Sequence, residues 1–236
     1  MIQFQSLNKS FGRLKVLKNI SGQFKPGAVS AIIGHNGSGK TTLMKCLLGL
    51  NNSDSGEIII NGTTLKGGPD FKKLIGYMPQ IARFPENLTS SELLNMVIEL
   101  RGQPANRSQE MIDYFGLAQH MNKPVGHLSG GTRQKINASI AFMFDPDILI
   151  LDEPSAGLDP VSNQLLKKMI LEEKTKGKTV IITSHVLSDL EELCDNLLCL
   201  FDGDIVFNGG MNSLLYGGGD KTLESALASL IRSSGK

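Results

Sequence analysis

Residues 29–42 read VSAIIGHNGSGKTT, a short and mostly apolar run followed at once by a loop with three glycines. A run of this length and composition, Val29–Ile33, is typical of a strand that is buried on both faces of a largely parallel sheet. The glycines let the loop backbone curl so that successive N–H groups can face one anion, and the following helix, Thr42–Leu48, adds the positive end of its dipole. The stretch therefore predicts an α/β fold with an anion site where this strand ends.

The loop also fits the pattern G-x-x-x-x-G-K-[ST], which cradles the phosphates of a nucleoside triphosphate. In that pattern Lys40 reaches the β- and γ-phosphates, and the hydroxyl of Thr41 can hold Mg²⁺. The alternative is a glycine-rich turn that matches by chance, but the strand before it, the helix after it and the complete Gly-Lys-Thr argue against that. We predict nucleotide contacts from Gly34, His35, Asn36, Gly37, Ser38, Gly39, Lys40, Thr41 and Thr42.

A second apolar run ends in two adjacent carboxylates, because residues 148–154 read ILILDEP. Neighbouring carboxylates disfavour each other's ionisation unless a cation or separate roles make both useful. Alone, the stretch could be a core strand that runs out into a solvated loop. Beside a phosphate-binding loop, an acidic residue at the end of a second buried strand holds Mg²⁺, and we assign that role to Asp152, acting through metal-bound water. Glu153 lies beyond the strand end, where it can act as general base on an attacking water.

Several other runs predict strands. Thr179–Thr183 resembles the two strands above, because each ends in the kind of polar turn where a parallel sheet binds its ligands. Asp202-Gly203 is a strong hairpin signal between two short apolar runs. The strands that we expect to be antiparallel are Ile2–Leu7, Val16–Phe24, Glu57–Ile60, Leu197–Phe201 and Asp204–Phe207.

Strand signals stop between Ile81 and Pro146, where apolar residues recur at helical spacing. The first helix is expected over Ser91–Arg101, with Ser90 or Ser91 as its cap. Further helices are expected over Gln109–Phe115, Thr132–Phe144 and, after the flexible run Gly217–Gly219, as a short amphipathic helix over Thr222–Ile231. We therefore expect one domain over 1–236, with a nucleotide-binding core (1–80 and 146–215), an inserted helical subdomain (81–145) and a C-terminal tail (216–236).

The composition is that of an ordinary globular protein, with 236 residues of which 40% are hydrophobic and 20% charged. A net charge of +1 gives no sign of a nucleic-acid footprint, so no nucleic-acid partner is expected. The apolar runs are too short to span a membrane, and the polar start, Met1–Lys9, lacks the apolar segment of a signal peptide. Cys46, Cys194 and Cys199 form no disulfide or metal pattern, which predicts reduced cysteines and a cytosolic protein.

Residues 128–135, LSGGTRQK, predict a second helix end that can bind an anion. Ser129 can cap the helix, while Gly130 and Gly131 expose backbone N–H groups. An ordinary capped helix would explain this stretch if it stood alone. Together with the phosphate loop, however, it resembles the ATP-binding cassette (ABC) ATPase family over residues 2–215, with the motifs in family order. They are GHNGSGKT (Walker A), IGYMPQ (Q-loop), LSGGT (signature), ILILDEP (Walker B), SAGLDP (D-loop) and IITSHV (switch histidine).

The resemblance implies an α/β fold: a P-loop NTPase core of the ABC type with a mixed sheet, an antiparallel β subdomain and an inserted α-helical subdomain. It implies that Gln80 touches Mg²⁺ and the attacking water, and that His185 contacts the γ-phosphate. A lone histidine after a strand is otherwise more often structural. In the family, two chains close around two ATP molecules, so the signature loop of each would cover the ATP of its twin. Asp159 would then help to couple the two sites.

Two positions depart from the family pattern. Thr132 stands where a glutamine is usual, although Ser129, Gly130 and Gly131 are intact. Phe11 takes the place of the tyrosine that stacks on adenine, and a phenyl ring keeps the stacking but loses the hydroxyl. The selectivity for ATP over GTP therefore stays open.

The resemblance favours an ATPase subunit of a transporter, active with ATP and Mg²⁺ as a homodimer. Such a subunit docks on integral membrane permease subunits at the cytoplasmic face of the cell membrane. The loop IARFPENLTS (81–90) would line the docking groove beside Gln80, with Phe84 and Pro85 as contacts, although Phe84 could equally be core packing.

The short single cassette is most similar to ABC-2-type ATPases, and it also resembles the ATPase of the copper-related transporter that matures nitrous-oxide reductase. The alternative is a soluble ABC ATPase that acts on nucleic acid or ribosomes, although such proteins usually carry two cassettes or a long coiled coil. A small-molecule kinase would have no use for LSGGT.

Overall fold

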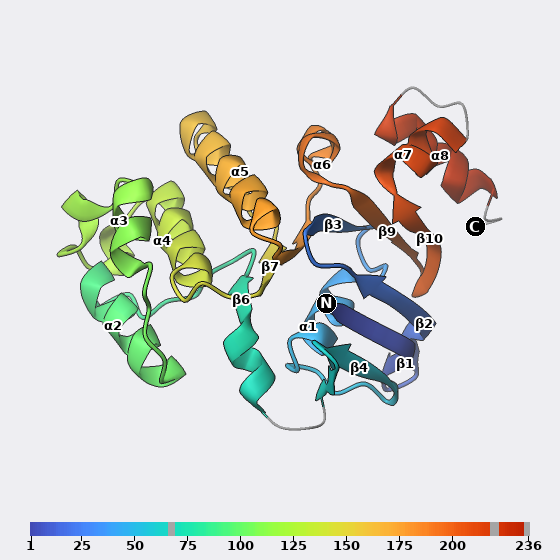
Figure 1. The fold of residues 1–236 in the computed structure, drawn as a ribbon, viewed down its shortest axis with the longest axis horizontal. Coiled ribbons are helices and arrows are strands. Elements are labelled where there is room, and N and C mark those ends of the chain that lie inside the picture. The colour runs from blue at the N-terminus through green and yellow to red at the C-terminus, as the bar shows by residue number, and fades with distance from the viewer. Residues whose placement is uncertain (66–68, 218–221, 234–236) are drawn as a thin grey trace.

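Two β-sheets organise the computed structural model, which describes residues 1–65, 69–217 and 222–233 (Figure 1). The larger sheet has the strand order β10-β9-β3-β8-β7-β6, and all of its neighbouring strands are parallel except β10 and β9. Its strands are β3 (Ala28–Ile33), β6 (Ile75–Met78), β7 (Ile148–Asp152), β8 (Thr179–Thr183), β9 (Asn196–Phe201) and β10 (Asp204–Gly210). Because β3, β7 and β8 are neighbours, their carboxyl ends meet at one edge of the sheet.

The smaller sheet is antiparallel throughout, with the order β2-β1-β4-β5. Its strands are β1 (Ile2–Phe11), β2 (Leu14–Phe24), β4 (Ser55–Ile60) and β5 (Thr63–Thr64). The first helix, α1 (Lys40–Leu47), shares one hydrophobic core with both sheets. Alternate residues of β7 divide between two cores, since Ile148 and Ile150 face this core while Leu149 and Leu151 face the helices on the other side.

Those helices include three between the sixth and seventh strands, α2 (Ser90–Arg101), α3 (Ser108–Tyr114) and α4 (Gly130–Phe142), which lie side by side at one end of the molecule (Figure 1). Short 3₁₀ turns are found at Pro69–Leu74, Ala118–His120 and Val125–His127. The remaining helices are α5 (Pro160–Thr175), α6 (Leu187–Leu193), α7 (Met211–Gly217) and α8 (Leu223–Ser233). In the described ranges, no helix is both long and apolar enough to cross a membrane.

The cap of α2 was predicted wrongly. Thr89, not Ser90 or Ser91, is the N-cap, and its hydroxyl accepts a hydrogen bond from the Glu92 N–H at 3.2 Å. The Glu92 carboxylate in turn accepts from the Thr89 N–H at 2.8 Å, which completes a reciprocal capping box. Ser90 is already inside the helix and fully buried, so its hydroxyl has no access to the helix end.

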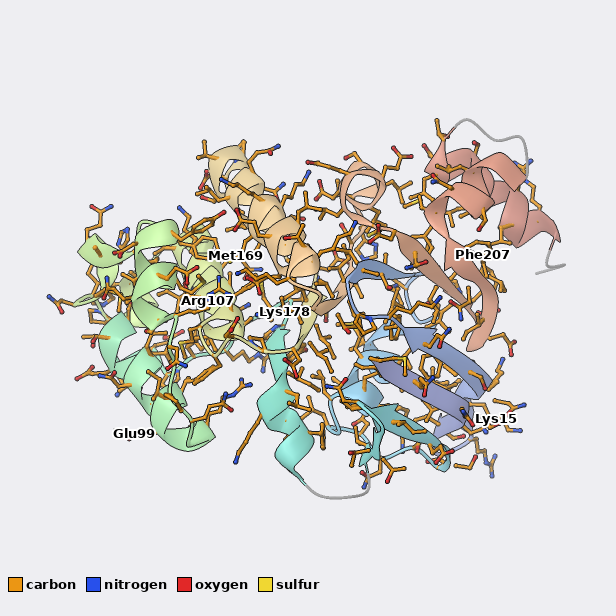
Figure 2. All side chains as sticks on the ribbon, in the orientation of Figure 1. Lys15, Glu99, Arg107, Met169, Lys178 and Phe207 are labelled. Carbon is orange, nitrogen blue, oxygen red and sulfur yellow. The ribbon has the colours of Figure 1, made fainter. Side chains whose placement is uncertain are left out.

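A buried ionic cluster joins the helices of residues 81–145 to α5. The fully buried carboxylate of Glu173 on α5 lies 2.7 Å from Arg107 beside α3, 2.9 Å from Lys176 and 2.5 Å from Lys178. Figure 2 shows Arg107 and Lys178 at this junction. Burial alone would raise the pKa of Glu173, but the hydrogen bonds from Lys178, Lys176 and Arg107 outweigh it and lower that pKa. Because three cations compensate it, this buried charge ties two distant segments together.

The predicted fold class is confirmed, and the predicted strands and helices are found, Thr179–Thr183 with the same ends and the others with shifted ends. The predicted helix Thr132–Phe144, for example, begins two residues earlier at Gly130. The hairpin strand β9 also pairs in parallel with β3, which was not predicted, nor were β6, α5, α6 and α7. Positions 218 and 219 of the predicted flexible run lie outside the described residues. Cys46, Cys194 and Cys199 are buried and free. The division into core, helical subdomain and tail stays a prediction.

Candidate active site

The phosphate-binding loop spans residues 34–39, between the end of β3 and the start of α1. Gly39 is the N-cap of α1 and has φ +109°, and no side chain caps this helix end. A Cβ at Gly39 would lie 2.9 Å from the Val16 carbonyl oxygen, so the position suits only glycine. The buried Ser38 hydroxyl finds no hydrogen-bond partner among the described residues. The loop thus presents backbone N–H groups and a hydroxyl that an anion could satisfy.

Lys40 lies across this loop. Its Nζ donates to the carbonyl oxygens of Gly34 at 2.7 Å and His35 at 3.1 Å. Partial burial lowers the pKa of Lys40, while the nearby carboxylates of Glu153 and Asp152 oppose that effect. The cation is therefore held at the mouth of the loop with two carboxylates facing it.

A cavity of about 520 Å³ opens beside the loop and collects most of the predicted catalytic residues. Lys40, Thr41, Gln80, Asp152, Glu153 and His185 all line it, although they come from four separate stretches of the chain. Leu14 and Val16 of β2 give it an apolar side, and its other lining residues are Asn36, Gly37, Gly39 and Thr42. Its volume falls in the range of small-molecule sites, roughly 300–1,000 Å³.

Asp152 is held by a residue that the sequence analysis missed. It ends β7 in register with Thr183 at the end of β8, and the Thr183 hydroxyl donates to Asp152 Oδ1 at 2.5 Å. The same hydroxyl oxygen accepts from the Glu153 N–H at 3.0 Å. Thr183 thus holds the carboxylate of Asp152 and the backbone of Glu153. The sequence did offer a signal for this contact, because Thr183 ends a predicted strand, and parallel pairing of that strand with ILILD places Thr183 beside Asp152.

Glu153 and His185 form a pair inside the cavity. Glu153 Oε1 lies 3.2 Å from His185 Nε2, and Glu153 Oε2 accepts from the His185 N–H at 3.2 Å. Glu153 is buried and has φ +50°, a conformation that costs a non-glycine residue free energy. Such strained positions gather at functional sites. The turn after β7 therefore aims the second carboxylate back into the cavity rather than out to solvent.

Thr41, Gln80 and Asp152 offer a hydroxyl, an amide and a carboxylate oxygen on the same cavity. Mg²⁺ prefers oxygen ligands and usually takes one or two carboxylates together with substrate phosphates and water. Within the described residues, no group of three or more His, Cys, Asp and Glu could hold a metal ion without such help. The three side chains fit a Mg²⁺ that is bound jointly with a nucleotide.

The signature residues do not line this cavity. Ser129 caps α4 by accepting from the Thr132 N–H at 3.2 Å, and its hydroxyl also lies 2.8 Å from the Thr132 hydroxyl. Ser129 and Gly130 are exposed, and Gly131 lies close to Gly157, whose carbonyl oxygen would be 3.1 Å from an added Cβ. The signature end is thus a surface feature beside the D-loop.

Asp159 caps the next helix, α5. It accepts from Ser162 N at 3.0 Å and from Ser162 Oγ at 2.5 Å, and these hydrogen bonds lower the pKa of Asp159 to about 2. Asp159 also lies 3.7 Å from Lys135 of α4. Asp159 therefore stays ionised at neutral pH, on the same side as the signature end and outside the cavity.

Two hydrogen bonds connect α4 with the cavity. Asn137 Nδ2 donates to the carbonyl oxygen of Pro79, the residue before Gln80, at 2.8 Å. Gln134 Nε2 donates to the carbonyl oxygen of Pro154, the residue after Glu153, at 3.4 Å. A movement of α4 would therefore shift the backbone next to two cavity residues, Gln80 and Glu153.

Besides the signature residues and Asp159, four predicted nucleotide contacts lie outside the cavity lining: Gly34 and Ser38 of the loop, Phe11 and His35. Phe11 ends β1 with 51% of its surface exposed, and Lys9 Nζ lies 5.3 Å from its ring centroid. One face of the ring thus has a cation beside it. The His35 backbone belongs to the loop, but its imidazole turns away from the cavity toward Phe201 and Asp202.

Comparison with known proteins identifies the family. The family model described as ABC transporter matches residues 17–156. The chain belongs to the ABC transporter family. It is 34% identical over 206 residues to the lantibiotic transport ATP-binding protein SrtF of Streptococcus pyogenes, which covers 87% of this chain and 89% of that protein. It is also 32% identical to the linearmycin resistance ATP-binding protein LnrL of Bacillus subtilis, over 98% of this chain and 76% of that protein.

Solved structures agree with this assignment. An ATP-binding subunit of an ABC transporter superposes with a TM-score of 0.92 at 27% identity, over 98% of this chain and 99% of that one. The dimeric bacterial ABC transporter cassette MJ0796 has a TM-score of 0.81 at 22% identity, over 89% of this chain and 99% of that one, which shows the shared fold. This ABC family member is therefore an ATPase with an ATP-binding cassette fold. The roles of its individual residues stay predictions.

Proposed function

We propose that this ATPase is the nucleotide-binding subunit of a membrane transporter whose permease is made by separate chains. Support comes from the family and from relatives named for lantibiotic transport and linearmycin resistance. Relatives named for Nod factor export are 30% and 31% identical to it. These cargoes differ chemically, so the cargo of this chain is left open, and the similarity to the transporter for nitrous-oxide reductase maturation stays a prediction.

In this proposal, the 520 Å³ cavity binds MgATP, and the convergence of the catalytic residues on that cavity carries the assignment. Lys40 and the loop N–H groups neutralise the phosphates, while Thr41, Asp152 and Gln80 hold Mg²⁺. Glu153 accepts the proton of the attacking water, and His185, which pairs with it, contacts the γ-phosphate.

The exposed signature end supports a dimer. Ser129, Gly130 and Gly131 do not line the cavity of their own chain, yet they present an N-terminal helix end that suits a phosphate. A second copy could bring its cavity against this end, so that two chains enclose two ATP molecules. Asp159, held beside the signature end, would then face the partner's nucleotide.

The permease would dock near Gln80, on the loop of residues 81–90. Pro85 is exposed there, whereas Phe84 is half-buried and packs against the core, which favours Pro85 as the contact. Movement of the loop would reach α4 through the Asn137–Pro79 hydrogen bond. In this proposal the chain would lie on the cytoplasmic face of the cell membrane.

Photo-crosslinking in the native host tests the proposal. A photoreactive amino acid at position 85 should trap an integral membrane protein, identified by mass spectrometry. The same amino acid at Lys15, exposed on the smaller sheet away from α2–α4 (Figure 2), is the matched control and should not trap it. Trapping of ribosomal proteins or nucleic acid at position 85 would instead support the soluble alternative and contradict a transporter subunit.

A further inference from the structure

The side chain of His35 has contacts that only its protonated form satisfies. Its Nδ1 lies 2.7 Å from the carbonyl oxygen of Asn36, and its Nε2 lies 3.2 Å from Asp202 Oδ1. A carbonyl oxygen and a carboxylate both accept hydrogen bonds and donate none. A neutral imidazole carries one N–H and can serve one of these acceptors, whereas an imidazolium carries two and serves both.

Asp202 belongs to the turn between β9 and β10, which packs behind the phosphate loop. The N–H of Gly203 donates to the carbonyl oxygen of Ser38 at 3.1 Å, and the Gly203 carbonyl accepts from the Lys18 N–H at 2.9 Å. The Phe201 ring meets the His35 ring edge-on, with centroids 4.7 Å apart. The turn therefore holds the loop at two points, by the backbone at Ser38 and by the imidazole at His35.

His35 is also one of the two residues that position Lys40, the other being Gly34. The carbonyl oxygen of His35 accepts from Lys40 Nζ at 3.1 Å, so the peptide that anchors the catalytic cation carries the anchored imidazole. When the ring loses its second proton, one of its two anchors is lost and that peptide gains freedom. The effect on nucleotide would pass through Lys40 rather than through contact with the imidazole.

We propose that His35 and Asp202 form a protonation-dependent clamp that positions the phosphate loop for ATP, and that His35 is a positioning residue rather than a nucleotide contact. The inference rests on the proposed MgATP site. The clamp is complete when His35 is protonated and loosens as the pH rises, so it favours ATP binding on the acidic side.

The charged surroundings of His35 are simple. The β9–β10 turn supplies Asp202, and the loop itself supplies Lys40. On its remaining side lies an apolar pocket of about 240 Å³, to which α8 contributes Leu227 and Leu230. The titratable groups of that pocket are His185 and Cys199, and burial raises the pKa of Cys199 to about 12, so that thiol is neutral. Among the residues that the structure describes, Asp202 is thus the charged partner that faces the ring.

The test compares wild type with Asp202→Asn by calorimetric binding of MgATP at about pH 5.5 and about pH 8.5, on either side of the usual histidine titration. Asparagine tolerates the φ of +48° at this position, so the turn should persist. The pair is half-exposed, so we expect the variant to bind about two- to fivefold more weakly at the lower pH. The ratio of the two dissociation constants should lie closer to one at the higher pH, because a neutral ring lacks the charge that strengthens its contact with Asp202. Other effects of pH on ATP binding are common to both proteins, so they cancel in the ratio of the two affinities.

Two further proteins make the result specific. Asp113→Asn, an exposed carboxylate on α3, is the matched control and should follow wild type at both pH values. In a His35→Asn background, Asp202→Asn should no longer change the affinity. Two results would overturn the clamp: an affinity ratio between Asp202→Asn and wild type that is the same at both pH values, or a loss of affinity from Asp202→Asn that persists in the His35→Asn background. If wild type itself bound no ATP, the proposed function would fail together with the clamp, whereas normal binding with a flat ratio removes the clamp alone.

Discussion

The N-termini of α1 and α4 both follow glycine-containing loops, but they are stabilised in opposite ways. The α1 end has a glycine N-cap, no capping side chain, and a place beside a cavity with Lys40 across its mouth. The α4 end has a serine N-cap that satisfies the Thr132 N–H, and it lies exposed at the surface. Both helices have a positive N-terminal end, but only at α4 does a capping side chain satisfy one of the free N–H groups.

The difference assigns separate tasks to the two ends. An uncapped end inside a cavity gains stability when an anion arrives, so it suits the primary phosphate site. A capped end keeps its shape without a ligand and can meet a phosphate that is already bound elsewhere. This agrees with the proposal that α1 binds the chain's own ATP and α4 closes over the ATP of a second copy.

The largest effect is expected at the α1 end. Lys40→Ala removes the cation beside the phosphates, and no other lysine lies in the loop, so ATP affinity and hydrolysis should fall by about 100-fold or more while the fold persists. Calorimetry with MgATP measures the affinity. Lys45→Ala, an exposed lysine on the same helix, is the control and should bind normally. Wild-type hydrolysis by a folded Lys40→Ala protein would remove α1 from the mechanism.

The next effect separates binding from turnover at the same cavity. Glu153→Gln keeps the size and the hydrogen-bonding oxygen but removes the base, so ATP should still bind while turnover falls by about 10²-fold or more. Because ATP is not cleared, the variant should also accumulate as a dimer in sizing chromatography with MgATP. Glu99→Gln, on the exposed face of α2 (Figure 2), should hydrolyse ATP like wild type. An unchanged rate for Glu153→Gln would leave Glu153 no catalytic role.

A smaller loss is expected from the α4 end. Ser129→Arg places a bulky side chain on the exposed signature surface, so it should block closure against a second copy and reduce hydrolysis by about tenfold or more. Binding of MgATP by the single chain should be spared. Mixing this variant with Lys40→Ala should restore part of the activity, because one composite site then joins an intact loop to an intact signature. Normal hydrolysis by Ser129→Arg alone would argue that α4 takes no part.

The sequence was enough to place the motifs on their elements, because each depends on a local pattern of strand, turn and helix. Lys40, Thr41, Asp152 and Glu153 were predicted in one site, and the cavity brings them together. The Thr183–Asp152 contact was not predicted, since it depends on which strands pair and in which register. Neither the segment 148–152 nor the segment 179–183 shows by itself that the two strands pair.

Side-chain direction was the other limit. The pattern G-x-x-x-x-G-K-[ST] fixes the backbone of His35 in the loop, but it does not say that the imidazole turns toward Asp202. At α2, two serines lie where the helical spacing of apolar residues begins, and we expected one of them to be the cap. Thr89 is the cap instead, because Thr89 and Glu92 form the T-x-x-E capping box. In both cases a contact that forms only in the folded turn determines which side chain interacts with which group.

The smallest effect isolates the cap itself. Ser129→Ala removes the hydroxyl that caps α4 without adding bulk, so the free energy of unfolding should fall by about 1 kcal/mol, the usual cost of losing a serine cap. Urea unfolding measures it, and Thr89→Ala should cost at least as much, because the Thr89 hydroxyl also donates a hydrogen bond to the Glu92 carboxylate at 2.8 Å. Ser129→Thr keeps a hydroxyl and should retain most of the stability. An unchanged unfolding midpoint for Ser129→Ala would mean that α4 does not depend on its cap, and the contrast with α1 would then rest on exposure alone.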